Sequence, residues 1–332
     1  MHDGNDPADS PPSMTLQHLL TVVTTESRAR GAGSVVRLLD AGCGDGRLLI
    51  HFARHLAPWA DGGSIELYGF DILGPGVQKQ AFLDRTVERL AIGAPGVPWE
   101  RRIAWIRPDE AWPYPEGFFH AVVSNQVLEH VRDHGHFFTQ LFRTLAWGGF
   151  SAHLFPLKHC VYEGHVHLPF AHRIGDHELL QSYIATLSAI GLGKYRVHRR
   201  ATGISLERSA ERDADYLRRY TNYLTHREIL RLAKRHGLRA SFKYSREFYT
   251  QKLRAMCSLP QRQTYERRRS SMADWISVLG LRYLSSVTLF LEKVDAFRPP
   301  GVAGWQLGEK QSAPLKGHDS LAPAQASRPP GT

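Results

Sequence analysis

The chain has 332 residues, 42% of them hydrophobic, and a formal net charge of +10. This length and apolar content are enough for a sizeable core, in one large domain or one domain with insertions. No run of about 18 apolar residues occurs, which argues against a transmembrane helix. The polar segment 1–13 lacks the features of a secretory signal, and the three cysteines are isolated, so we expect a disordered N-terminus and a cytoplasmic protein without disulfides.

Predicted strands and helices alternate through the first half of the chain. Leucines and valines at helical spacing predict a first helix over 14–30. Strands are predicted at 35–39, 65–72, 103–106, 121–124 and 149–155. Helices are predicted between them at 48–56, 77–90 and 137–145. Such alternation is typical of an α/β fold, in which helices cover both faces of a parallel sheet.

The pattern changes after Pro156, which we take as the end of a core spanning 14–156. Residues 157–224 are rich in His, Tyr and Arg without a clear strand period, so we predict an inserted helical or irregular cap. Thr225 and Glu228 then predict a capped helix that stops near Gly237.

The remaining predictions concern the end of the chain. Segment 225–295 is expected to complete the core, with strands at 242–249 and 287–294 and further inserted helix between them. The tail at 296–332 is rich in Pro, Ala, Ser and Gly, which predicts disorder.

A glycine-rich turn follows the first predicted strand, and it reads Leu-Leu-Asp-Ala-Gly-Cys-Gly-Asp-Gly over 38–46. Glycines let a ligand approach the backbone, and the following helix offers unpaired N–H groups to a phosphate or carboxylate. Asp71 ends the next strand, where a carboxylate binds ribose hydroxyls. Asp40 and Asp45 would repel a pyrophosphate. S-adenosylmethionine (SAM) has no phosphate and carries an ammonium and a sulfonium, so the pattern favours SAM over a pyridine dinucleotide.

Further motifs follow at the expected places: Gly-Phe-Asp-Ile over 69–72, an acidic segment over 108–114, a fourth-strand segment over 119–131, and a glycine turn over 143–149. Together with the first turn, these motifs make 35–156 resemble the class I SAM-dependent methyltransferases. The resemblance implies a Rossmann-like, doubly wound, seven-stranded sheet with an insertion after its fifth strand. His120 departs from the Asp usual in that family, which affects only local packing.

The resemblance also implies a cofactor site. Asp40 and Gly42 would border the methionine moiety, Asp71 would bind the ribose, and Asp109 would meet the adenine amine. The full predicted set is Asp40, Gly42, Cys43, Gly44, Gly46, Asp71, Ile72, Asp109, Glu110 and Asn125.

A titratable cluster follows the fifth strand and supplies the predicted catalytic residues, Glu163, His165, His167 and His172. Alternate residues of an extended segment share a face, so we expect the first three to point the same way. One histidine would act as a general base toward a hydroxyl acceptor. Metal binding by His-x-His with Glu163 and ordinary polar packing of a loop are the alternatives, and the prediction includes no metal. The Glu-His pair at 129–130 is interpreted as structure near the cofactor, with a role as base as the alternative.

The predicted function is methyl transfer from SAM to a hydroxyl, amine or carbon of a small-molecule or glycan-like acceptor. Basic residues gather over 196–269, and although such runs are usually solvated faces, they motivate an RNA or tRNA methyltransferase as one alternative. A non-catalytic SAM-binding scaffold subunit is the other. The fourth strand lacks the Asn/Asp-Pro-Pro-Tyr segment common in nucleobase and glutamine methyltransferases, which disfavours those acceptors.

Overall fold

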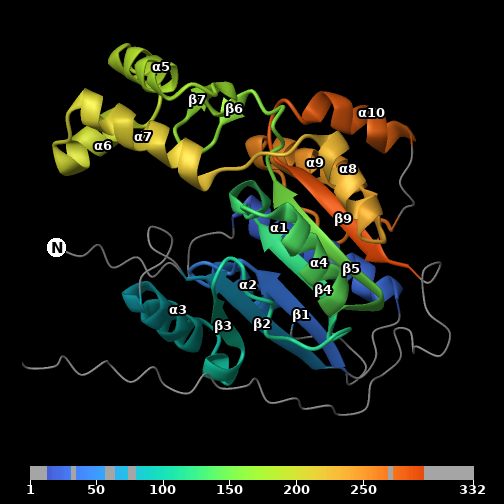
Figure 1. Cartoon of the computed structure of the whole chain (residues 1–332). Coiled ribbons are helices and arrows are strands. Elements are labelled where there is room, and N and C mark those ends of the chain that lie inside the picture. Colours follow the sequence, from blue (N-terminus) through green and yellow to red (C-terminus); the bar gives the residue numbers. More distant parts are fainter. Residues whose placement is uncertain (1–12, 31–34, 57–63, 74–79, 268–271, 295–332) are drawn as a thin grey trace, which may run out of the picture.

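A seven-stranded sheet runs through the centre of the molecule (Figure 1). The computed structural model describes residues 13–30, 35–56, 64–73, 80–267 and 272–294. The predictions of disorder for 1–12 and 296–332 lie outside these residues. No helix in the described part of the chain is both long and apolar enough to cross a membrane.

The sheet has the strand order β3-β2-β1-β4-β5-β9-β8. Its strands are β1 (Val35–Ala41), β2 (Ser64–Ile72), β3 (Ile103–Ile106), β4 (Phe119–Asn125), β5 (Leu145–Phe155), β8 (Leu238–Ser241) and β9 (Val287–Lys293). Strands β1 to β5 pair in parallel, whereas β9 lies antiparallel between β5 and β8. The predicted α/β fold with seven strands is therefore confirmed, and its last two strands make the sheet mixed.

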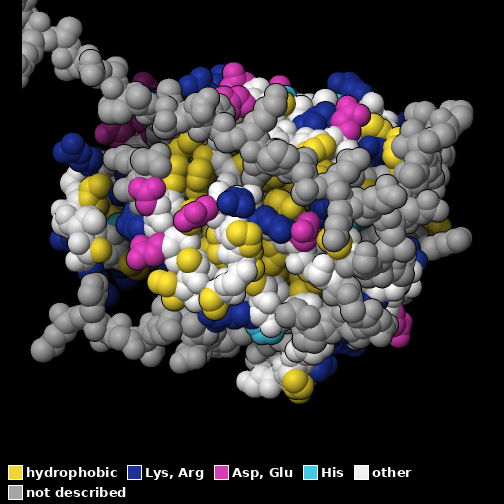
Figure 2. Space-filling model, turned by 90° about the horizontal axis from the view of Figure 1, so that it is seen from below, with side chains coloured by type: hydrophobic (Ala, Val, Ile, Leu, Met, Phe, Trp, Pro, Cys, Tyr) yellow, Lys and Arg dark blue, Asp and Glu magenta, His cyan; other side chains and the backbone are white. Residues whose placement is uncertain are grey.

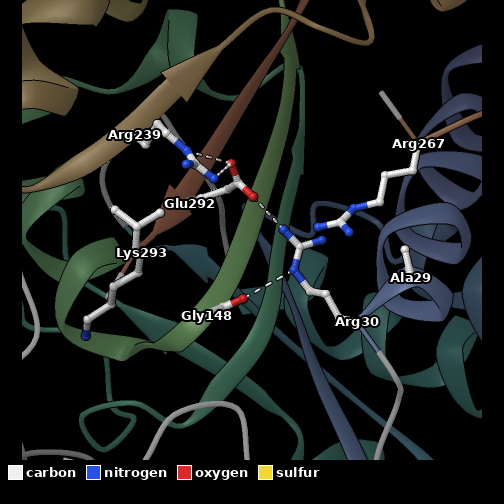
Figure 3. A pocket seen from close by; sticks show the side chains of 8 residues that line it. Ala29, Arg30, Gly148, Arg239, Arg267, Glu292 and Lys293 are labelled. Carbon is white, nitrogen blue, oxygen red and sulfur yellow. Dashed lines mark hydrogen bonds and ion pairs between the residues drawn. The ribbon is translucent and has the colours of Figure 1, made fainter. Parts of the chain in front are cut away.

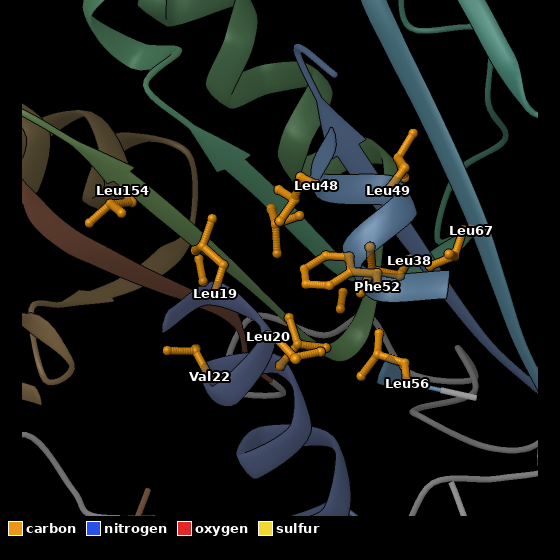
Figure 4. Close-up of a cluster of buried hydrophobic side chains, with 14 of the residues drawn as sticks. Leu19, Leu20, Val22, Leu38, Leu48, Leu49, Phe52, Leu56, Leu67 and Leu154 are labelled. Carbon is orange, nitrogen blue, oxygen red and sulfur yellow. The ribbon is translucent and has the colours of Figure 1, made fainter. Parts of the chain in front are cut away.

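Helices cover both faces of the sheet. The core helices are α1 (Met14–Ala29), α2 (Arg47–His55), α3 (Gln80–Gly93), α4 (His134–Thr144), α8 (His226–Arg235), α9 (Ser245–Met256) and α10 (Met272–Leu281). Successive strand residues point to opposite faces, and β1 shows this directly. Leu38 packs with Leu19 of α1 and Phe52 of α2 (Figure 4), whereas Leu39 packs with Phe138 of α4 and Ile229 of α8. Packing of these two apolar layers on its faces holds the sheet in place, and this positions the ends of its strands.

The predicted cap is a separate small layer with its own core. It contains a two-stranded hairpin, β6 (Tyr162–Glu163) and β7 (Leu168–Pro169), a short helix η3 (Ala171–Arg173), and helices α5 (His177–Ala189), α6 (Tyr195–Thr202) and α7 (Leu206–Tyr220). Buried side chains of these elements pack on one another, among them Leu168, Ile184 and Leu217. In Figure 1 the cap stands above one end of the sheet, which is the end where β5 finishes.

The segment that returns from the cap is tied to the sheet by backbone hydrogen bonds. The N–H of Asn222 donates to the Glu129 carbonyl (2.6 Å), and the N–H of Lys158 donates to the Leu224 carbonyl (2.9 Å). Glu129 lies in the short helix η2 (Leu128–His130), directly after β4. The cap is therefore anchored at the carboxyl ends of β4 and β5.

The predicted helix start at Thr225 is confirmed, but the strand predicted at 242–249 is wrong. Thr225 and Glu228 form both hydrogen bonds of a capping box, and Gly237 has a φ of +72° just beyond the end of α8. The strand is β8, which ends at Ser241, and α9 begins at Ser245. Tyr244 precedes α9 and Phe248 lies within it, both buried, and the aromatic content of the segment suggested a strand instead.

Candidate functional site

Glycine is required at two positions of the turn between β1 and α2. Gly42 and Gly46 both have a φ of +81°, in the left-handed region that side chains disfavour. A Cβ at Gly42 would lie 2.6 Å from Cγ2 of Val127, and one at Gly46 would lie 2.8 Å from the Leu90 side chain. The turn is thus held closely against the segment after β4 on one side and against α3 on the other.

Asp71, at the end of β2, braces this turn. Its Oδ2 accepts a hydrogen bond from the N–H of Gly44 and its Oδ1 accepts one from the N–H of Ile72, both at 2.6 Å. Burial raises the pKa of Asp71, although these two backbone donors oppose the shift. Asp71, which is predicted to bind the ribose, therefore lies directly beside the glycine turn, and hydrogen bonds from the backbone fix its position.

Asp40 has the environment expected of a residue that faces a cation. The side chain is 1% exposed, and its Oδ1 has no hydrogen-bond partner in the described part of the structure. Burial, and then the nearby Asp71, raise the pKa of this carboxyl well above its usual range. A buried acceptor without a donor is costly. A positively charged group such as the ammonium or sulfonium of SAM would compensate that cost, so these residues fit SAM.

The other predicted cofactor residues lie at the same edge of the sheet. Asp109 and Glu110 follow β3, and Asn125 ends β4 with a buried Oδ1 that lacks a partner among the described residues. Asp45 pairs with Arg47 and Arg89. Ligands of doubly wound sheets bind outside the carboxyl ends of the strands. The predicted set gathers at that edge.

Glu163 organises the titratable cluster of the cap. Its buried carboxylate accepts hydrogen bonds from His165 Nδ1 and the Tyr223 hydroxyl, both at 2.6 Å, and from the N–H groups of His165 (2.8 Å) and Val166 (2.7 Å). Burial alone raises the pKa of Glu163, but these hydrogen bonds outweigh it and lower the value to about 2. Glu163 is thus an anion that fixes the orientation of the His165 ring.

The far side of the His165 ring faces a second histidine. His165 Nε2 lies 3.1 Å from Nε2 of His130, and the other nitrogen of His130 lies 2.6 Å from the Tyr220 carbonyl oxygen. His130 ends η2, three residues after Val127, which packs on Gly42. The cap therefore brings His165 to the segment after β4, in which Val127 lies close to Gly42.

His167 and His172 do not join this contact. Residues 164–167 form a turn between β6 and β7 rather than an extended segment, and His167 has a φ of +59°. The expectation that Glu163, His165 and His167 share a face is therefore wrong for His167, which is exposed and lies against the Tyr162 ring. His172 packs on the Tyr223 ring at 4.7 Å, and its Nε2 lies 3.1 Å from the Lys158 carbonyl oxygen.

The predicted site leaves out Tyr223, and also Glu129 and His130, which are interpreted as structure near the cofactor rather than as a base. Glu129 is 1% exposed, and neither of its carboxylate oxygens has a partner in the described part of the chain. Burial raises the pKa of Glu129 to about 8. The signal for Glu129 and His130 was the adjacent Glu-His pair directly after the fourth strand. Nothing local marks Tyr223, which reaches Glu163 across the cap.

Two cavities lie outside the glycine turn. One, of about 440 Å³, is lined by Arg30, Gly148, Arg239 and Glu292 among others (Figure 3). Its charges are paired with one another, since Arg30 and Arg239 both contact Glu292. Gly148 lies near the start of β5, so this cavity is at the amino ends of the parallel strands, opposite the candidate site.

The second cavity, of about 420 Å³, runs along α7 beside the histidine pair. It is lined by charged side chains of both signs together with Tyr216 and Tyr220. The Tyr216 ring lies 5.4 Å from the His165 ring and 6.3 Å from the His130 ring. The groove therefore shares Tyr216 with the surroundings of the two histidines, which do not themselves line it.

Comparisons with known proteins agree with the motifs. The family model described as a methyltransferase domain matches residues 14–240, more than half of the chain. No curated protein matches the chain.

Solved structures similar to the chain include three methyltransferases. A geranyl diphosphate methyltransferase in complex with SAM is 16% identical with a TM-score of 0.42, covering 84% of this chain and 85% of its own. A phosphoethanolamine N-methyltransferase 2 from Haemonchus contortus is 14% identical with a TM-score of 0.42, over 83% of this chain and 51% of its own. A geranyl diphosphate C-methyltransferase from Streptomyces coelicolor A3(2) is 16% identical with a TM-score of 0.40, over 79% and 72%. With the family model matched over most of the core, the chain belongs to the methyltransferase-domain family, and the prediction of a class I, SAM-dependent methyltransferase is confirmed.

Proposed function

We propose that the protein transfers the methyl group of SAM to a hydroxyl, amine or carbon of a small-molecule or glycan-like acceptor bound beneath the cap. The observation that carries this proposal is the contact between His165 and His130. The cap supplies the first histidine and the segment after β4 supplies the second, so the two meet at the edge of the sheet where a cofactor would lie.

The cofactor would lie on the turn formed by 40–46. Asp40 would face its positive charge, Asp71 its ribose, and Asp109 with Glu110 its adenine. SAM, when bound, supplies a methyl group on a sulfonium sulfur that is already reactive, so alignment and exclusion of water account for much of the rate. The fixed turn provides alignment, and the cap above it excludes water.

The acceptor would enter along the α7 groove. Its two tyrosines offer flat apolar surfaces with a hydroxyl at one end, and its charged side chains offer hydrogen bonds, a combination that suits a polar small molecule or a sugar. Next to Tyr216 of this groove, Glu163 orients His165 toward His130. We propose that this histidine pair contacts the acceptor atom that loses a proton. The lone pair of that acceptor atom then attacks the methyl carbon of SAM.

A nucleic-acid acceptor is disfavoured by the arrangement of charges. Arg212 pairs with Asp213 and Arg219 with Asp215 along the groove, so much of the basic charge of α7 is neutralised locally. Figure 2 shows the side of the molecule away from the cap, where basic and acidic side chains are also interspersed. Phosphate backbones are bound by concentrated positive charge.

We expect methyl transfer from labelled SAM to appear in the small-molecule or glycan fraction of a cell extract. Nuclease treatment before the assay should leave that labelling unchanged, and heat-inactivated enzyme serves as the control. Label that disappears after nuclease treatment would show an RNA acceptor and refute the proposal. SAM binding without transfer to any fraction would support the scaffold alternative instead.

A further inference from the structure

The two facing histidines have their outer nitrogens already committed. His130 Nδ1 lies 2.6 Å from the Tyr220 carbonyl oxygen, which only accepts, so this nitrogen carries a proton. His165 Nδ1 lies 2.6 Å from a carboxylate oxygen of Glu163 that also accepts a hydrogen bond from the Tyr223 hydroxyl, so this nitrogen carries a proton as well. In the neutral rings both Nε2 atoms then present lone pairs to each other across 3.1 Å. This point between the rings requires a positive charge.

Glu129 adds a third donor to the same point. The ligand atoms of Glu129, His130 and His165 all lie within 4.8 Å of one another. The Glu129 side chain is 1% exposed, and neither carboxylate oxygen has a hydrogen-bond partner in the described residues. Leaving a buried carboxyl unpartnered is costly, and metal ligation is one of the few ways to satisfy it.

We propose that Glu129, His130 and His165 bind a divalent first-row transition-metal ion. Two nitrogens bound about 2.1 Å from one ion at an angle of about 95–110° lie roughly 3.1–3.4 Å apart, which agrees with the observed nitrogen spacing. Bound ligands lie closer together than the 4.8 Å limit of this triad, so the ion would draw the Glu129 carboxylate inward. The ligand set of two imidazoles and one carboxylate suits Zn²⁺, Fe²⁺ or Co²⁺ better than Mg²⁺.

The surroundings of the triad match those of metal-binding histidines elsewhere. Such histidines donate their second N–H to a carboxylate or a backbone carbonyl, which fixes the tautomer and the ring orientation. His165 donates to Glu163, and His130 donates to the Tyr220 carbonyl. Both outer partners are therefore in place without any ion, and they leave Nε2 as the free ligand atom on each ring.

This site rests on the proposed function and deepens it, because three protein ligands leave positions open for the acceptor. A metal ion lowers the pKa of a bound hydroxyl. For a hydroxyl acceptor, the O–H bond breaks and its proton passes to water, while the oxygen forms the new bond to the methyl carbon. The S–C bond breaks with its electron pair returning to sulfur, so the sulfonium becomes a neutral thioether.

Metal binding is tested without SAM or acceptor. We expect full-length protein stripped with a chelator to take up one equivalent of Zn²⁺ or Co²⁺, measured by elemental analysis, with visible absorption of the Co²⁺ form. Glu129→Gln and His165→Asn should abolish tight binding. Glu163→Gln alters only the outer partner of His165, so it should weaken binding about tenfold to hundredfold. His177→Ala is the matched control, because His177 pairs with Asp215 in the same cap at 3.0 Å but is not part of the triad.

The outcomes separate this inference from the proposed function. No retained metal, or unchanged affinity in Glu129→Gln and His165→Asn variants that melt like wild type, would overturn the metal site. If methyl transfer to a small molecule still required His165 in that case, the proposed function would stand with a shared proton in place of the ion. Stoichiometric metal lost in both variants would support the site, even if no small-molecule acceptor were labelled.

Discussion

Replacing His165 by alanine is expected to lower turnover about hundredfold or more while leaving SAM affinity nearly unchanged. His165 contacts Glu163, Tyr223 and His130, where we propose that the acceptor binds. Under that proposal the substitution removes an interaction with the acceptor and none with the cofactor. Steady-state kinetics at saturating SAM, with a calorimetric titration of SAM alongside, measure the two effects separately.

A second variant and a control separate chemistry from packing. Glu163→Gln preserves shape but removes the charge that orients His165, so it should reduce turnover by a smaller factor. His55→Ala, at an exposed position at the end of α2 and outside the cap, should retain wild-type turnover. If His165→Ala instead lowers the melting temperature and the turnover per folded molecule is unchanged, the ring has only a packing role.

Replacing Glu26 by glutamine is expected to destabilise the fold by about 3–5 kcal/mol. The Glu26 side chain is fully buried in α1 and pairs with Arg30, Lys243 and Arg267, and it also accepts a hydrogen bond from the Tyr244 hydroxyl. Glutamine would remove the anion that pairs with Lys243 and Arg267, and it would leave Arg30 paired with Glu292. Urea unfolding measures the loss. Asp215→Asn, which breaks an exposed pair, should cost at most about 1 kcal/mol.

The same carboxylate makes stability depend on pH. Burial raises the pKa of Glu26, but Arg30 and Lys243 outweigh it and lower the value to about 2, from 4.5 in the unfolded chain. The unfolded state therefore binds the proton first, so the contribution is complete above pH 4.5 and is lost as pH falls toward 2. At neutral pH it amounts to about 3 kcal/mol. Unfolding free energies of wild type and Glu26→Gln that differ equally at pH 7 and pH 3 would contradict this account.

Local signals predicted the core of the fold well. The glycine turn, the acidic residue after the next strand and the Thr225 capping box each depend on a few neighbouring residues, and the structure has them where the sequence placed them. The strand predicted at 242–249 failed because its buried aromatic residues suit a strand and a helix equally well. Tyr244, directly before α9, and Phe248 within it pack in the core with α1 and β9, which a local pattern does not reveal.

The candidate site was predicted only in part, because its residues come from distant segments. Glu163 and His165 are close in the chain and were predicted. Their contacts with His130 and Tyr223 bridge 35 and 60 residues, and they depend on how the cap returns to the sheet. Glu129 gave no local sign of lacking a partner, since that property appears only when its surroundings are known.

The most direct test of the account is a calorimetric titration of purified protein with SAM. We expect one molecule of SAM to bind per chain. The affinity should be about tenfold to hundredfold weaker in Asp71→Ala, because a hydrogen bond from the ribose to a carboxylate contributes roughly 1.5–3 kcal/mol of binding free energy. Gly42→Val should abolish binding, because a Cβ there would lie 2.6 Å from Val127 in a turn with a φ of +81°. Unchanged SAM affinity in both variants would contradict the placement of the cofactor on this turn.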